Sequence, residues 1–362
     1  MQLLPAVTIV HLDAGFAPFA FLASPKRAGT SDISSYSMTQ AAPRTTAQQH
    51  EFRVVLCFAL VYILWGSTYL AMRVAVRDLP PFVVGASRYL VSGPIMLLAC
   101  ALMGRKIRIS RHDFWRLLAI GVVLLSVGNM GIVWGERYVE SSLAALVVAL
   151  MPIWVVAIEA WVYRAGRMTR QGYLGLTAGL LGLLVLLWPR ITSGTHPGHL
   201  ELLGCGILAC GSLAWSFGSV FSHRFDVHAD IFVGASWQMT LGGLVNAMIA
   251  GVSGQFQHAR WTAPAIESIA YLVVFGSWIG YSAFIFLLEH VPTPKVATYT
   301  YVNPIVALLL GWLLLHEHID TYMLVGTVII IGSVALVNTS KLKPARAEEP
   351  EPDFSSVNVS GN

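Results

Sequence analysis

The chain has 362 residues, of which 56% are hydrophobic and only 12% are charged, and its formal net charge is +4. Soluble domains carry roughly a quarter charged residues, so this deficit indicates a protein that uses a lipid bilayer as its solvent. The small net charge argues against nucleic acid as a partner.

The first segment, residues 1–53, is polar and rich in Ala, Thr, Ser and Gln, and we expect it to be disordered. It lacks the basic start and the apolar stretch with a cleavage site that a secretory signal peptide requires. Met38 opens a short polar leader that runs directly into the first apolar stretch. We therefore hypothesise that Met38 is the natural start and that residues 1–37 are not translated in the native protein.

Ten apolar stretches follow, each long enough to cross the hydrocarbon core of a bilayer, which takes about 20 residues at helical rise. Five lie in a first half, residues 54–189, and five in a second half, residues 202–339. The connections are too short for a soluble domain, and the polar tail 340–362 is expected to be disordered. The sequence thus predicts an all-α integral membrane protein with ten transmembrane helices, at 54–76, 82–103, 114–134, 142–163, 172–189, 202–222, 231–252, 267–288, 296–315 and 322–339.

Lys and Arg in the connections predict the orientation, because cytoplasmic connections carry an excess of them. With the N-terminus inside, the inner segments hold most of these residues, and the outer connections hold only Arg77, Arg137, Arg190 and Arg260. This asymmetry places both termini in the cytoplasm and the chain in the cytoplasmic (inner) membrane.

An internal repeat relates the two halves. A shift of 152 residues superposes Gly66 on Gly218 and Pro152 on Pro304. Because each half holds an odd number of predicted helices, the halves cross the membrane in opposite directions. Inverted repeats of this kind are common in secondary transporters, which bind substrate near the midplane between the halves.

The first predicted helix contains the run LWGSTYLAMR at residues 64–73. Gly66 and Ser67 are suited to a packing seam, because small residues let helices approach and a hydroxyl can bond to its own backbone. Alternatively, Trp65 and Tyr69, one turn apart, face a central cavity in which Ser67 orients a substrate. The residues alone leave both interpretations open.

Several charged residues lie within or at the ends of the apolar stretches. Arg73 and Arg88 fall in the outer halves of their helices, where a charge is costly unless it meets water or a partner. Glu136 closes the third helix at the same level, so we expect either a structural Arg–Glu pair or a direct role of these residues at an outer gate. Glu159, in the fourth helix, is either paired with Arg164 or a protonatable site.

Proline lies at corresponding places in the fourth and ninth helices, as Pro152 and Pro304. A proline frees a backbone carbonyl, which must then face protein or a water-lined cavity. In the ninth helix, Tyr299, Tyr301 and Asn303 add hydroxyls and an amide beside the expected break. Paired breaks in the two halves indicate a binding site, although proline also kinks purely structural helices.

Further polar and aromatic residues are candidates for the wall of the cavity. Asn129 and Trp134 lie in the third helix and Trp215 in the sixth. Asn129, like Gln238 and Asn246 in the seventh helix, could equally form hydrogen bonds between helices. We expect a mostly apolar and aromatic cavity that suits amphipathic or zwitterionic small molecules.

No catalytic or cofactor motif accompanies these residues. The sequence has no GxxxxGK[ST] loop for ATP and no GxGxxG run. His316 and His318 are two residues apart, which would point their imidazoles to different faces of a helix, so we predict no metal site. The GVSG run at 251–254 sits at a helix end without a mid-membrane histidine to activate its serine. We expect no enzyme activity and no cofactor.

Three stretches carry a resemblance to a known family. Residues 59–90, with WGST followed by an arginine, resemble the first repeat of the EamA family in the drug/metabolite transporter superfamily. GSLAWSFGSVFSHRF at 211–225 and YTYVNPIVALLLGWLLLHEHI at 299–319 look like parts of its second repeat. The resemblance covers roughly residues 54–340 and is nearest to the YedA-like exporters of that family.

The resemblance implies two inverted five-helix EamA repeats around a central cavity, and export of small metabolites or drugs by alternating access. One departure matters: the family has a glutamate after helix four that matches Glu317, whereas this chain reads VYRAGRMT at 162–169. The resemblance carries functional roles to Trp65, Ser67, Arg73 and Arg88 in the first half, and to Tyr301, Asn303, Pro304 and Glu317 in the second.

The combined interpretation is a secondary transporter that exports small amphipathic metabolites, amino acids or drugs, with the bilayer and a small-molecule substrate as partners. A proton exchanged at Glu136 or Glu159 is the coupling ion that the sequence offers, and uncoupled efflux is the alternative. An importer in the same fold stays open, as does a membrane sensor, although the connections leave no room for a soluble sensory domain. The sequence does not determine the oligomeric state, and a monomer is compatible with it.

Overall fold

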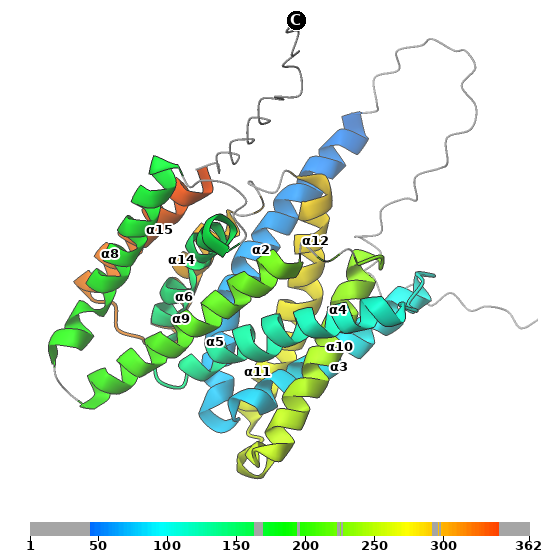
Figure 1. Ribbon diagram of the computed structural model, residues 1–362, viewed down its shortest axis with the longest axis horizontal. Coiled ribbons are helices and arrows are strands. Elements are labelled where there is room, and N and C mark those ends of the chain that lie inside the picture. Colours follow the sequence, from blue (N-terminus) through cyan, green and yellow to red (C-terminus); the bar gives the residue numbers. More distant parts are fainter. Residues whose placement is uncertain are drawn as a thin grey trace, which may run out of the picture.

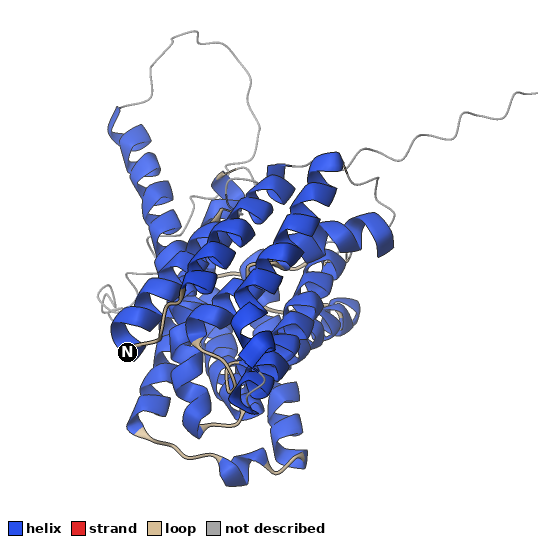
Figure 2. Cartoon of the chain, turned by 90° about the vertical axis from the view of Figure 1, so that its left-hand side faces the viewer, coloured by secondary structure: helices blue, strands red, loops and turns tan. Residues whose placement is uncertain are grey.

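The computed structural model describes residues 44–162, 169–193, 196–222, 225, 227–291, 296 and 298–339. Within these ranges every regular element is a helix, as Figure 2 shows, so the all-α prediction is confirmed there. The predictions for residues 1–43 and for the tail 340–362, including the start at Met38, concern residues outside this description.

Figure 1 shows how the helices are arranged. Most are α-helices, η1, η2 and η4 are wound as π-helix, and η3 is a short 3-10 helix. The first half contains α2 (Arg44–Asp78), α3 (Pro81–Leu102), α4 (Arg111–Gly121), η1 (Val122–Gly128), α5 (Asn129–Gly135), α6 (Ser141–Val148), α7 (Met151–Ala157), η2 (Ile158–Val162) and α8 (Arg170–Ser193). The second half contains α9 (His196–Ser222), α10 (Ile231–Val252), η3 (Gln255–His258), α11 (Ala263–Tyr271), η4 (Leu272–Ile279), α12 (Gly280–His290), α14 (Tyr299–Leu315) and α15 (Thr321–Thr339).

Seven helical segments of the described chain are long and apolar enough to cross a membrane, and two shorter apolar helices, α14 and α15, accompany them. The boundaries differ from the predicted ones mainly at the helix ends. Because α2 begins at Arg44, residues 44–53 are helical rather than disordered. Hydropathy marks the apolar part of a helix but not its polar extension, and the Gln, Glu and Arg residues of this extension are good helix formers.

The two prolines predicted to break helices have different effects. α6 ends at Val148 and α7 begins at Met151, with Pro152 in the first turn of α7, where its missing N–H costs no helical hydrogen bond. In contrast, α14 continues through Pro304, so the break predicted there is wrong. Pro304 lies in the second turn of α14, so the hydrogen bond that it removes is near the helix start and the later turns are unaffected.

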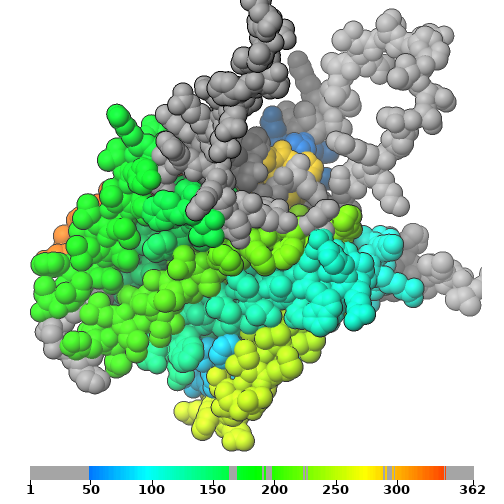
Figure 3. Space-filling model, in the orientation of Figure 1, coloured from blue at the N-terminus to red at the C-terminus, as the bar shows by residue number. Residues whose placement is uncertain are grey.

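Helices of the two halves pack against one another in pairs. α3 lies along α10 and α8 along α15, while α9 packs against η1 and α5, and α2 packs against α11, η4 and α12. Figures 1 and 3 show α9 running across the face toward the viewer, beside α4 and α5. Every one of these contacts joins a helix of one half to a helix of the other, so much of the core lies between the halves.

Glycines allow the closest of these approaches, between α3 and α10. A Cβ added at Gly93 would lie 2.6 Å from the backbone nitrogen of Thr240, and one added at Gly243 would lie 2.9 Å from that of Leu90. The two helices therefore meet backbone to backbone, as small residues permit in membrane helices.

Candidate functional site

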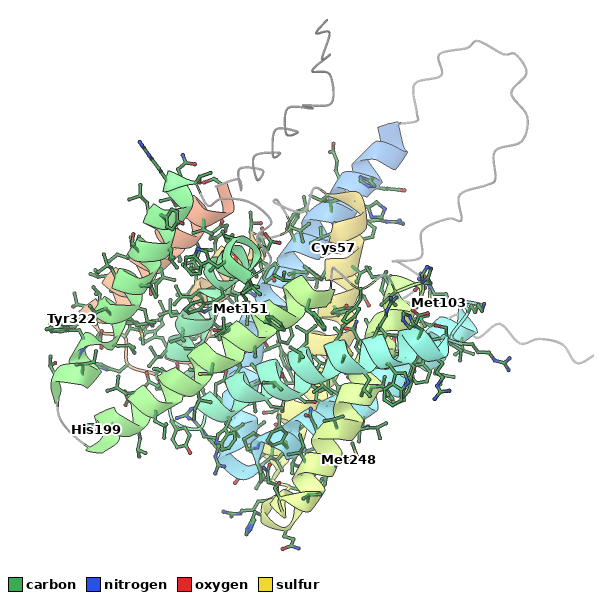
Figure 4. The ribbon with its side chains drawn as sticks, in the orientation of Figure 1. Cys57, Met103, Met151, His199, Met248 and Tyr322 are labelled. Carbon is green, nitrogen blue, oxygen red and sulfur yellow. The ribbon has the colours of Figure 1, made fainter. Side chains whose placement is uncertain are left out.

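The bundle has two ends. The terminal side is the end where α2 begins and α15 ends, and both lie in the upper part of Figure 1. The far side is the opposite end, which Figure 4 marks with His199 near the start of α9 and Tyr322 near the start of α15. The far side carries the α5–α6 connection with Glu136 and the α14–α15 connection with Glu317.

Trp65 lies between aromatic rings of the second half. Its ring centroid is 4.9 Å from that of Phe284 and 5.2 Å from that of Tyr299, and its Nε1 donates to the carbonyl of Gly276 at 3.2 Å. A Cβ added at Gly280 would lie 2.7 Å from Trp65 Nε1, so α12 closes tightly over the indole. α2 is thus joined to η4, α12 and α14 at this point.

The small residues after Trp65 form a packing seam. A Cβ added at Gly66 would lie 2.7 Å from the Cβ of Val306, so α14 crosses α2 there. Ser67 Oγ donates to the carbonyl of Leu64 at 2.9 Å and pairs with the hydroxyl of Tyr271 at 2.6 Å. In this conformation Gly66 and Ser67 therefore serve helix packing, which is the structural alternative of the sequence interpretation.

Asn303 connects α14 to α2. With its amide oriented to suit its neighbours, Nδ2 donates to the carbonyls of Tyr62 at 3.2 Å and of Tyr299 at 3.1 Å. Tyr301 points to another helix, since its hydroxyl donates to the carbonyl of Val334 in α15 at 3.2 Å. The amide and hydroxyl groups predicted for the cavity thus bond to neighbouring helices.

Three half-buried tyrosines, Tyr69, Tyr281 and Tyr299, lie beside this crossing. The ring centroids of Tyr281 and Tyr299 lie 6.4 and 5.7 Å from that of Phe284, and Tyr69 comes from α2. Tyr69 is within electrostatic reach of both Tyr299 and Glu136. Each of the three tyrosine side chains keeps part of its surface accessible, so the two halves share an aromatic region here that is not fully covered. This is the region in which Trp65 also lies, through its contact with Tyr299.

Three other predicted cavity residues have different surroundings. Asn129 is buried and its Oδ1 accepts from the hydroxyl of Tyr89 at 2.8 Å. Trp215 is half-buried and packs where Gly128 lets α9 approach η1. Trp134 is 42% exposed and therefore lies on the surface of the bundle. Asn129 and Trp215 thus have packing contacts, and Trp134 is turned away from the interior.

The arginines and the glutamate of the predicted ion pair contact other groups in the structure. Arg88 Nε donates to Ser277 Oγ at 3.0 Å, and its guanidinium lies over the ring of Tyr89 at 5.1 Å, because this face of α3 packs on η4. Arg73 donates to the backbone carbonyl of Glu136 and not to its carboxylate. Both carboxylate oxygens of Glu136 lack a hydrogen-bond partner among the described residues, so an ion pair with Arg88 is not formed in this conformation.

Two further predictions concern polar groups near the helix ends. Glu159 is half-buried in η2, and its predicted partner Arg164 lies outside the described residues. His316 and His318 are exposed in the α14–α15 connection. Among the residues that the structure describes, no group of three His, Cys, Asp or Glu side chains could hold a metal ion.

Glu317 makes four side-chain hydrogen bonds from the second half to the first. Its Oε1 accepts from the backbone N–H and the Oγ of Ser141 at 2.8 and 2.7 Å, and its Oε2 from those of Ser142 at 3.0 and 2.6 Å. These N–H groups belong to the first turn of α6, so the carboxylate caps the positive end of that helix. We call this contact the Glu317 latch.

The sequence named Glu317 only through its resemblance to the family and missed the two serines. The available signal was the pair Ser141-Ser142 at the start of an apolar stretch, where helix N-terminal N–H groups need acceptors. What the sequence does not show is that the acceptor comes from the other half of the chain, 176 residues away.

The backbone around Glu317 is shaped for the latch. His316 ends α14 in the left-handed region with a φ of 54°, and the N–H of Glu317 donates back to the carbonyl of Gly311 at 3.1 Å. A Cβ added at Gly311 would overlap Glu317 Oε2, so the carboxylate lies against the bare backbone of α14. The tight turn and the missing side chain together direct the carboxylate onto α6.

The fourth predicted helix corresponds to α6 and α7 and the ninth to α14, and we call the line along which they face each other the seam. In the described part of the chain the seam is closed only near the latch. α14 packs along α6, whereas α7, which continues the same predicted helix toward the terminal side, packs on α9, α15 and α8 and hardly touches α14. α6 and α7 are separated by the interruption between Val148 and Met151. The seam is therefore tight on the far side and parted on the terminal side.

Comparison with known proteins decides the family. The EamA-like transporter family matches the chain twice, over residues 52–188 and 202–339. The chain belongs to this family. The resemblance stated from the sequence is thereby confirmed, and the two matches correspond to the two halves described above.

Individual EamA relatives agree. The uncharacterised inner membrane transporter YedA of Escherichia coli (strain K12) is 32% identical over 292 residues, which cover 80% of this chain and 92% of YedA. The uncharacterised transporter YvbV of Bacillus subtilis (strain 168) is 26% identical over 82% of this chain and 95% of its own. A solved crystal structure, 18% identical, superposes with a TM-score of 0.56 over 78% of this chain and 95% of that chain, which shows the shared fold.

The family and the apolar helices together give the coarse function. The protein is a membrane transporter of the EamA family and a multi-pass protein of the cytoplasmic (inner) membrane. A transporter of this kind works in a lipid bilayer and takes small-molecule substrates.

Proposed function

We propose that this EamA protein is a secondary transporter that exports small amphipathic metabolites, amino acids or drugs by alternating access. Ten transmembrane helices form two inverted five-helix repeats, with both termini in the cytoplasm. The terminal side of the bundle then faces the cytoplasm and the far side faces outward. The substrate binds beside Trp65, Tyr69 and Tyr299, and Asn303 and Ser67 become available to it when the α2–α14 crossing loosens.

The observation that carries this proposal is the half-buried tyrosine cluster contributed by both halves. Tyr69 comes from α2 of the first half, and Tyr281 and Tyr299 come from α12 and α14 of the second. A site shared by both halves is what alternating access needs, because a movement of one half against the other then changes the access to it. The lining is aromatic, which favours amphipathic cargo over phosphorylated sugars.

The pairing of helices supports the inverted arrangement. In each half the second and fifth predicted helices pack on their counterparts, as α3 with α10 and α8 with α15. The first and third predicted helices pack crosswise, as α2 with α11–α12 and η1–α5 with α9. Such reciprocal pairing is expected when two repeats are related by an axis in the membrane plane.

A flux assay tests the proposal. Protein reconstituted into lipid vesicles is offered a panel of radiolabelled amino acids and cationic dyes, with and without a proton gradient. We expect at least one compound to cross faster than through protein-free vesicles, and Trp65→Ala and Asn303→Ala to reduce its flux at least about fivefold, the effect of losing about 1 kcal/mol of binding. Trp312, 55% exposed on α14, provides the control Trp312→Ala, which should leave flux unchanged.

The same assay separates the alternatives. Accumulation against a gradient in vesicles of known orientation distinguishes export from import. If no compound on the panel moves faster than in protein-free vesicles, or if both variants transport like the parent protein, the proposed substrate site is wrong.

A further inference from the structure

Glu136 is a fully buried acid without a hydrogen-bond partner. It follows α5 on the far side, its relative exposure is 0%, and neither Oε1 nor Oε2 has a partner among the described residues. An ionised carboxylate out of water needs hydrogen bonds or a counter-charge at its oxygens, whereas a neutral carboxyl group is tolerated. The conformation described here therefore suits the protonated form of Glu136.

A positively charged side chain, that of Arg73, lies beside Glu136. The guanidinium of Arg73 donates to the backbone carbonyl of Glu136, so the cation is next to this residue but does not pair with its carboxylate. Arg73 also lies within electrostatic reach of Glu140 and Glu317. If Glu136 lost its proton, a rotation of its side chain or of Arg73 would bring the two charges together.

The other groups that face Glu136 come from several elements. From α2 it is faced by Arg73 and Tyr69, and from the α14–α15 connection by Glu317. Arg137 and Glu140 follow it in its own connection, and Arg137 is exposed. α9 packs on the adjoining Gly135 through Gly204 and Leu208, neither of which carries a charge.

Glu136 and the Glu317 latch are linked by charge. When Glu136 is neutral, Glu317 is the buried anion of the pair, and its charge is held by the serine groups of α6 and faces Arg73. When Glu136 is ionised, a second negative charge faces Glu317 and competes with it for Arg73. Both effects weaken the latch, because like charges repel strongly in a medium of low polarity.

We propose that Glu136 is a proton-binding site and that proton uptake there closes the Glu317 latch between the two halves. The carboxylate takes a proton from water on the far side, Arg73 returns to the backbone carbonyl, and Glu317 caps α6. Release of the proton pairs Glu136 with Arg73 and lets α14 leave α6. The inference rests on the proposed alternating access, in which this latch is the far-side gate.

The test measures the gate directly and needs no substrate. Two exposed positions on either side of the latch, Arg137 and Tyr322, are changed to cysteine in a background without the native cysteines, and nitroxide labels are attached. The distance between the labels is measured in lipid nanodiscs from pH 5 to pH 9. We expect a short and a long distance, whose ratio shifts toward the short one as the pH falls, by at most about tenfold per pH unit for one proton.

Three variants test whether Glu136 and Glu317 control the distance between the labels. Glu136→Gln, a neutral mimic, should keep the short distance at every pH, and Glu317→Gln should shift the distribution toward the long distance. The matched control is Glu267→Gln, an exposed carboxylate in α11, which should titrate like the parent protein. A distance that does not change with pH, or a Glu136→Gln variant that keeps the pH dependence of the parent, would overturn the proposal. The flux assay can fail or succeed independently, so the two proposals are separable.

Discussion

The two ends of the seam between α14 and the α6–α7 segment differ in chemistry. On the far side, Glu317 caps α6 with four hydrogen bonds, none longer than 3.0 Å, and α14 lies along that helix. On the terminal side, α7 turns to α9, α15 and α8 and leaves α14. The seam between α14 and the α6–α7 segment thus has a polar contact at one end and is parted at the other, although other helices of the two halves pack together at both ends.

The sequence explains why only the second half supplies a carboxylate for the Glu317 latch. The shift of 152 residues that superposes Pro152 on Pro304 also places Ala165 at the position of Glu317. The first half therefore brings no carboxylate to the corresponding place, although position 165 itself lies outside the described residues. Two repeats of one family therefore need not be equivalent: a carboxylate that only the second repeat carries supplies the cap of α6.

The largest expected effect follows removal of the latch carboxylate. Glu317→Ala leaves the first N–H groups of α6 and two serine hydroxyls without their acceptor in a buried place, which should cost about 3 kcal/mol of unfolding free energy. SDS titration of the protein in detergent micelles, followed by circular dichroism, measures this loss. An unchanged midpoint would mean that the latch contributes nothing to stability.

A smaller effect is expected where the latch rests on α14. Gly311→Ala introduces a methyl group into the space of Glu317 Oε2, and the resulting overlap should cost about 2 kcal/mol in the same titration. Gly332→Ala in α15 is the control, since nothing lies within 4 Å of the added Cβ. That variant should be neutral, or stabilised by up to about 1 kcal/mol through helix propensity. Equal effects of both substitutions would contradict the close approach at Gly311.

The smallest effect concerns the turn that directs the carboxylate. His316 adopts a φ of 54°, which glycine reaches without steric cost, so His316→Gly should stabilise the folded protein by about 0.5 kcal/mol after the entropy of the unfolded chain is counted. A clear loss of stability in the titration would show that the imidazole itself makes a contact that matters.

Much of the fold was predictable because a bilayer imposes strong rules. Backbone groups in hydrocarbon must bond within their own helix, so apolar stretches of sufficient length mark helices closely, as 82–103 does for α3 (Pro81–Leu102). Helix ends were less predictable, as the polar start of α2 shows, because water tolerates either helix or coil there. The break predicted at Pro304 was wrong for a related reason. Near a helix start, the missing N–H of a proline costs the helix little stability.

The candidate site was predicted in its residues but not in its partners. Trp65, Tyr69 and Tyr299 were named from the sequence, and two of them meet in one aromatic contact. The sequence named Arg73 and Arg88 together as candidate partners of Glu136, whereas only Arg73 lies beside Glu136 and Arg88 bonds to Ser277. The side of a helix on which a charged residue lies can be read from spacing, but the neighbour that it meets depends on how helices distant in sequence are assembled.

The sequence by itself determined the membrane as solvent, the helical class, the repeat and the family, because each of these is encoded in local composition, hydrophobic length or a run of matching residues. Only the tertiary structure decided that Glu317 reaches Ser141 and Ser142, that the buried carboxylate of Glu136 has no hydrogen-bond partner in the described part of the chain, and that the seam is tight at one end. These features are contacts between segments far apart in the chain. Their energies depend on burial and distance, which the order of residues does not specify.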